Sequence, residues 1–207
     1  RGLAADGFDR FLAFPLYPQY SLTTTKGSLH RSREAVRRFA PRARLEELSS
    51  WPTHPLFVEA HADSVREELA KFPDPRPEAT HLLFSAHSIP KKLVTREGDP
   101  YPTEVEASVR AISERLAWDG PVTLAYQSKL GPIEWLGPPT LEVLREVLET
   151  DNGPCALFVD ANDTAAFAAA VARLLHDTAL RAALITAQIE GLMLLIDPDG
   201  GRTMAIS

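Results

Sequence analysis

A histidine between two serines is the residue of this sequence best suited to acid–base or metal chemistry. His87 follows a continuous apolar run at 82–86, with Ser85 and Ser88 on either side of it. An imidazole titrates near neutrality, so it can accept a proton from a weak acid or offer a lone pair to a borderline metal such as Fe²⁺. The alternative is a structural histidine, held by hydrogen bonds in a strand-end turn. Both interpretations stay open, since strand-end loops carry function disproportionately.

Polar residues also follow two other apolar runs of strand length, at 11–16 and 122–126. The first is followed by Pro18–Ser21, which includes Tyr20, and the second by Gln127 and Ser128. In parallel sheets, ligands bind beyond the carboxyl ends of the strands. These side chains are therefore candidates for a binding site, although Gln127 and Ser128 are equally suited to holding the turn that follows them.

Short apolar runs alternate with amphipathic helical patterns along the chain. The strand-length runs are 11–16, 81–86, 122–126 and 156–159. The last three alternate with helices, which predicts parallel strands joined by right-handed crossovers. The expected fold class is therefore α/β, with a doubly wound parallel sheet.

Each predicted helix has a start signal and one apolar face. Ser28 is expected to cap the first helix, and Thr103 with Glu106 has the spacing of a capping box at the start of the third. Asp163 is expected to cap the last. The predicted helices are 28–40, 53–72, 103–117, 140–149 and 164–175. The residues expected to face inward include Ala35, Val36, Phe39 and Ala40 in the first helix and Leu141, Leu144 and Leu148 in the fourth.

Composition excludes several classes of protein. The chain has 22 Lys and Arg residues against 28 Asp and Glu, a net charge of −6 without a long basic tract, which disfavours nucleic acid as a partner. Its apolar runs, such as the one at 192–196, are all far short of the roughly 20 residues that a membrane span needs. The single cysteine, Cys155, forms no internal disulfide and fits a reducing compartment. Glycine-rich phosphate motifs and a G-x-S-x-G elbow are missing, so nucleotide binding and acyl transfer have no support.

A proline-rich segment divides the sequence. Pro73, Pro75 and Pro77 leave too few backbone donors for a helix or an inner strand, which predicts an extended linker. A domain boundary is therefore expected near Ala79.

Four motifs resemble the ferrochelatase family in order and spacing. They are Pro15–Ser21, Phe84-Ser85-Ala86-His87-Ser88-Ile89-Pro90, Gly98-Asp99-Pro100-Tyr101-Pro102, and Tyr126–Pro132 followed by Trp135–Pro138. The resemblance covers about residues 11–150. It implies two Rossmann-like halves with a tetrapyrrole between them, here residues 1–79 and 80–207. The first half is expected to be incomplete, because the family's first strands and porphyrin-covering loop have no counterpart before Arg1.

The resemblance also implies a function. Ferrochelatases insert Fe²⁺ into a porphyrin, which is the terminal metallation of haem synthesis, so the expected partners are ferrous iron and protoporphyrin or coproporphyrin. Fe²⁺ is then a substrate, and no tightly bound cofactor is expected. His87 matches the family's active-site histidine, which takes pyrrole protons or passes the metal. Tyr20, Ser21, Ser88, Gln127 and Ser128 match substrate-side positions. A cytoplasmic location, with a peripheral membrane contact, is part of the same implication.

The sequence departs from the family after the third buried strand. The family's Gly-Phe-x-x-Asp-His-x-Glu segment carries an acidic partner for the histidine, whereas this chain has Leu157–Asp163, in which Asp160 or Asp163 can stand in. From about Gly153 the chain resembles the final segment of a GT-B glycosyltransferase, which predicts a hybrid or incomplete chain. The alternatives to a chelatase are a non-catalytic tetrapyrrole-binding module and an inactive remnant.

Overall fold

The computed structural model describes residues 7–71, 75–150, 155–159, 193–196 and 203–206. The chain divides into two compact units, one formed from residues 1–54 and 91–108 and the other from 55–90 and 109–207. We call them the first and the second unit and describe each by itself. The division into family-like halves near Ala79 stays a prediction. The predicted helix at 164–175 lies outside the described residues.

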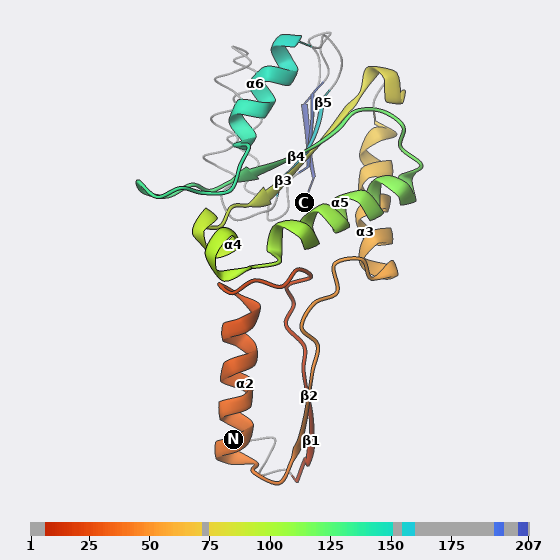
Figure 1. Cartoon of the computed structure of the whole chain (residues 1–207). Coiled ribbons are helices and arrows are strands. Elements are labelled where there is room, and N and C mark those ends of the chain that lie inside the picture. The colour runs from red at the N-terminus through yellow and green to blue at the C-terminus, as the bar shows by residue number, and fades with distance from the viewer. Residues whose placement is uncertain (1–6, 72–74, 151–154, 160–192, 197–202, 207) are drawn as a thin grey trace. The chain divides into compact units, whose positions relative to one another are not determined.

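The first unit contains a short parallel strand pair and the helix that connects it. Strand β1 (Arg10–Ala13) pairs in parallel with β2 (Arg44–Glu47), and helix α2 (Thr25–Phe39) lies beside them (Figure 1). A crossover helix is the usual way to join parallel strands. The run predicted at 11–16 stops early as a strand, because the Pro15 nitrogen has no hydrogen to donate to a ladder. β2 was not predicted, since Leu45 is its only apolar residue.

Helix α2 begins three residues earlier than the sequence pattern predicts. Ser28 lies inside the helix, where its Oγ donates to the Thr24 carbonyl at 3.3 Å, so the prediction of a Ser28 cap is wrong. The earlier start is accompanied by a different inward face. Thr25 and Leu29 are buried, whereas Ala35 and Phe39 are exposed.

The first unit also contains helix α4 (Lys91–Glu97) and residues 101–108 of helix α5 (Tyr101–Leu116). Asp99 precedes α5, and its Oδ1 accepts a hydrogen bond from the Tyr101 amide at 3.0 Å. This carboxylate satisfies one of the amides that a helix start leaves without a partner. Thr103 is already inside the first turn, so the predicted capping box of Thr103 and Glu106 is wrong.

The second unit is built on a five-stranded sheet in the order β4-β3-β5-β6-β7. Strand β3 pairs in parallel with β4 on one side and with β5 on the other, which confirms that the three predicted runs form parallel strands. The two further strands pair antiparallel and were not predicted as strands. The bounds are β3 (His81–His87), β4 (Val122–Gln127), β5 (Cys155–Val159), β6 (Met193–Ile196) and β7 (Thr203–Ile206).

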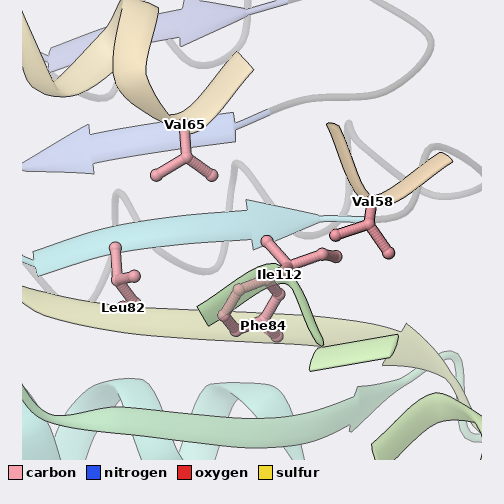
Figure 2. Packing of buried hydrophobic residues seen from close by; sticks show 5 residues of the cluster. All are labelled: Val58, Val65, Leu82, Phe84 and Ile112. Carbon is pink, nitrogen blue, oxygen red and sulfur yellow. The ribbon is translucent and has the colours of Figure 1, made fainter. Parts of the chain in front are cut away.

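Both faces of β3 are covered. Helix α3 (Pro55–Leu69) and residues 109–116 of α5 pack on one face, where the buried cluster contains Val58, Val65, Leu82, Phe84 and Ile112 (Figure 2). Ser85 points to the opposite face, because side chains alternate along a strand. Its Oγ shares a hydrogen bond of 2.7 Å with Thr140 Oγ1 at the start of helix α6 (Thr140–Thr150). An apolar strand buried on both faces is what the sequence predicts for residues 81–86.

The inward face of α6 differs in part from the prediction. Leu144 is fully buried as expected, together with Val143 and Val147, whereas Leu141 is exposed. Leu141 lies in the first turn, where the helix has only begun to cover the sheet. The Leu148 side chain lies outside the described residues.

Two glycine-to-alanine substitutions test the packing, one at Gly120 in the second unit and one at Gly27 in the first. Residues 72–74 of the predicted extended linker lie outside the described residues, and its last three form a short 3₁₀ helix, η1 (Pro77–Ala79). A Cβ at Gly120 would lie 2.4 Å from the Pro77 carbonyl oxygen. We expect Gly120→Ala to destabilise the chain by about 1–3 kcal/mol, because backbone atoms must move apart. Gly27→Ala in α2, where a Cβ meets nothing within 4 Å, should instead stabilise it by roughly 0.5–1 kcal/mol. Urea unfolding measures both, and equal midpoints would contradict the predicted contact.

Candidate functional site

His87 is the last residue of β3 and lies opposite Gln127, the last residue of β4, in the parallel register. It shares the sheet face of Ser85 and is half-buried. Its Nδ1 is enclosed and has no hydrogen-bond partner among the described residues. A buried polar atom without a partner is costly, so such atoms are uncommon and often mark functional groups. The predicted strand-end position of His87 is confirmed, while its predicted cleft and its role stay predictions.

Ser88 continues the pairing of the two strands beyond His87. Its amide donates to the Gln127 carbonyl at 2.8 Å, and its Oγ donates to the Leu136 carbonyl at 3.0 Å. Ser88 and Gln127 are both buried. The Ser88 hydroxyl therefore holds a neighbouring segment in place at the ends of the strands.

The segment after β4 is tied to both strand ends. The Leu136 amide donates to the Ile89 carbonyl at 3.0 Å, and the Tyr126 amide donates to the Pro138 carbonyl at 2.8 Å. Trp135 is half-buried, and its Nε1 donates to the Leu130 carbonyl at 3.0 Å. These contacts make the Trp135 turn a support for the strand ends.

Ser128 has a backbone conformation that is unusual for a serine. Its φ of 68° lies in the left-handed region, where a residue with a Cβ is destabilised relative to glycine. The chain turns away from the sheet at this point, directly after Gln127. Strained residues of this kind cluster at functional sites, so the conformation agrees with the placement of Ser128 among the candidate residues.

Tyr20 and Ser21 belong to the first unit. The Tyr20 amide donates to Glu104 Oε2 at 2.6 Å, and the Ser21 Oγ donates to Asp99 Oδ2 at 2.9 Å. Ser21 is buried, and Thr23 Oγ1 lies at hydrogen-bond distance, 2.8 Å, from its Oγ. The Ser21 hydroxyl is thus already engaged within its own unit.

The structure brings together His87, Ser88, Gln127 and Ser128, which follow one another along the ends of two paired strands. Sequence reasoning missed the roles of Asp99 and Glu104. Asp99 stands in the Gly98–Pro102 motif that carries the family resemblance, and this motif was the available signal.

The acids expected to assist His87 cannot be placed, since Asp160 and Asp163 lie outside the described residues. Within the described ranges there is no group of three or more His, Cys, Asp or Glu side chains that could hold a metal ion.

Over the same ranges no helix is long and apolar enough to cross a membrane.

Comparison with known proteins identifies the family of this chain. The Ferrochelatase family model matches residues 1–176, and the chain belongs to that family. The match begins earlier and ends later than the resemblance seen in the motifs at 11–150. It therefore includes the part of the chain just beyond Gly153, where the sequence was expected to leave the family. The GT-B resemblance of the C-terminal segment stays a prediction.

Individual relatives are similar over most of this chain. The mitochondrial ferrochelatase of Homo sapiens is 44% identical over 147 residues, which cover 70% of this chain and 34% of that protein. The mitochondrial ferrochelatase of Xenopus laevis is 43% identical over 146 residues, 68% of this chain and 34% of that protein. A ferrochelatase of a Synechococcus species is 41% identical over 150 residues, 71% of this chain and 38% of that protein. The matched part thus spans only about a third of each relative's length.

Proposed function

We propose that this chain acts in the insertion of Fe²⁺ into a porphyrin in haem biosynthesis. His87 is the proposed catalytic residue, and it also passes the metal. Tyr20, Ser21, Ser88, Gln127 and Ser128 are the proposed substrate-side residues. The supporting evidence is membership of the ferrochelatase family together with the position of His87 at the carboxyl end of a parallel strand. The mixed α/β fold with parallel strands is compatible with the doubly wound, Rossmann-like halves that we propose for it.

One observation carries the proposal. His87 Nδ1 is enclosed and has no hydrogen-bond partner among the described residues, although it lies within a well-bonded strand end. A histidine with a purely structural role would be expected to use both ring nitrogens in hydrogen bonds. A ring nitrogen kept free of such bonds is suited to a proton or a metal that arrives with the substrate.

The chemistry requires a base. Two pyrrole N–H bonds break as the metal forms bonds to the four ring nitrogens, so two protons must leave the porphyrin. The His87 imidazole is proposed to accept these protons one after the other and to release each to water, since imidazole is the side chain most often used for general acid–base catalysis. Ser21 and Ser88 are proposed to act through the segments that they hold, since their hydroxyls already have partners.

A non-catalytic tetrapyrrole-binding module is the second candidate function. No carboxylate among the described residues is hydrogen-bonded to His87 Nδ1, which favours binding without efficient proton removal. An inactive remnant is the third possibility. These alternatives differ in what they do with a porphyrin and a metal, so one assay separates them.

The test is titration of the purified chain with protoporphyrin and with coproporphyrin, followed by addition of Fe²⁺ or Zn²⁺ under anaerobic conditions. A chelatase shows saturable binding, seen as a shift of the porphyrin absorbance, and then loss of the metal-free spectrum faster than in protein-free buffer. Saturable binding without faster metallation identifies a binding module. Absence of binding to either porphyrin identifies the remnant and overturns the proposal.

Location and membrane contact are also part of the proposal. The turn after β4 exposes Leu130 and Ile133 beside Lys129, which are residue types suited to a peripheral contact with an anionic bilayer. We propose a cytoplasmic location, although two of the relatives above are named as mitochondrial proteins.

A further inference from the structure

Two carboxylates of the first unit converge on one short segment, residues 19–23. Asp99 Oδ2 accepts hydrogen bonds from the Ser21 Oγ and from the Leu22 amide, each at 2.9 Å. Glu104 Oε2 accepts from the Tyr20 amide at 2.6 Å. We call Asp99 and Glu104 the carboxylate clamp.

The clamp is anchored on its other side as well. Asp99 Oδ1 accepts from the Tyr101 amide at 3.0 Å, and Glu104 Oε1 accepts from the Ser50 Oγ at 3.1 Å. All four carboxylate oxygens therefore accept hydrogen bonds. Asp99 Oδ2 and Glu104 Oε2 accept from residues 20–22, and the other two oxygens accept from Tyr101 and Ser50. Gln19 extends the contact, because its Nε2 donates to the Ser108 Oγ at 2.8 Å.

The burial of the Asp99 carboxylate depends on hydrogen bonds from the segment that it holds. Asp99 is only 2% exposed, and none of the ion pairs among the described residues includes it. Burying a carboxylate is costly unless hydrogen bonds replace its hydration. Here three donors replace it, and two of them come from Ser21 and Leu22. The segment whose conformation Asp99 fixes therefore supplies most of the hydrogen bonds that compensate the desolvation of its carboxylate.

We propose that Asp99 and Glu104 are positioning residues that hold residues 19–23 in the conformation that receives the porphyrin. The inference rests on the proposed function, in which Tyr20 and Ser21 are substrate-side residues. Neither carboxylate touches the substrate. Each acts through the backbone amides of the segment, and Asp99 acts through the Ser21 hydroxyl as well.

The experiment compares Asp99→Asn and Glu104→Gln with the parent chain. An amide keeps the shape of the carboxylate but offers one oxygen instead of two, so at least one donor on each clamp residue then faces an NH₂ group. Loss of one such charge-assisted bond should raise the porphyrin KM, or the Kd where only binding is measured, by about tenfold. The kcat at saturating porphyrin should change much less, since His87 is untouched.

Leu29→Ala is the control for a merely structural role. Leu29 is buried in α2 of the same unit and is not part of the clamp. Its truncation is expected to lower stability while the hydrogen bonds of the clamp to residues 19–23 are kept. A smaller folded fraction lowers the apparent kcat and leaves KM unchanged. If the clamp variants behave like Leu29→Ala, or if their KM equals that of the parent chain, the positioning role is overturned.

A second measurement judges the clamp without any porphyrin. The amides of Tyr20 and Leu22 donate to Glu104 and Asp99, so their hydrogen exchange should be slow in the parent chain. It should become about tenfold faster for Tyr20 in Glu104→Gln and for Leu22 in Asp99→Asn, while each variant leaves the other amide less affected. Unchanged exchange at both amides would overturn the clamp. Failure of the parent chain to bind a porphyrin would instead overturn the proposed function.

Discussion

Replacing His87 by alanine should lower the rate of metal insertion by roughly 10²–10⁴, the usual contribution of one general base. The substitution removes the ring nitrogen that is proposed to take a pyrrole proton, while the strand pairing through the backbone of β3 and β4 remains. Porphyrin affinity should change little, since the other substrate-side residues are intact. The measurement is the initial rate of Zn²⁺ uptake, followed by the change in porphyrin absorbance.

The control for this prediction is His30→Ala. His30 is an exposed histidine of α2 whose Nε2 lies 3.5 Å from Glu34, so its loss changes the histidine content without affecting the site. Its rate should equal that of the parent chain. A His87→Ala rate within a factor of about two of the parent rate would refute the assignment of His87 as the base, since a general base normally contributes far more.

The largest effect on stability is expected for Ile112→Asp. Ile112 is 4% exposed and packs against Phe84 and Val58 in the core of the second unit. An aspartate there buries a carboxylate among aliphatic and aromatic side chains, which should cost about 4 kcal/mol or more. Because folded domains are stable by only about 5–15 kcal/mol, this loss would leave the second unit close to unfolding at room temperature.

Arg110→Asp is the matched change for that prediction. Arg110 lies on the same helix, α5, but is exposed, so the same new side chain stays in water. Its denaturation midpoint should lie close to that of the parent chain. Equal midpoints for Ile112→Asp and Arg110→Asp would show that residue 112 does not contribute to the core.

The central part of the second unit could be predicted because its signals are local. Leu82, Leu83 and Phe84 are consecutive apolar residues, and a strand buries all three only when both of its faces are covered. The position of His87 follows directly, since it is the first residue after the run at 81–86. β2 was missed because a strand with one apolar residue carries no such pattern, and its pairing with β1 is a contact between distant parts of the chain.

The errors at helix starts have a common cause. Ser28 and Thr103 have the right residue types for caps, but α2 and α5 begin earlier, and in α5 the Asp99 carboxylate bonds the first helical amide. A capping motif describes only a few neighbouring residues, whereas a helix begins where the remaining fold satisfies its free amides. Asp99 makes this bond and also binds Ser21, a contact that only the folded chain reveals.

The bond between Ser21 and Asp99 joins residues 78 positions apart in the sequence. Neither residue can change alone without leaving a buried hydroxyl or a buried carboxylate short of a partner. Over evolutionary time the two positions should therefore vary together or not at all among ferrochelatases, and a chimaera of parents that differ at both positions should inherit a mismatched pair. Between such parents, recombination points from residue 23 to residue 98 would be selected against even where each parental segment is fully functional in its own protein.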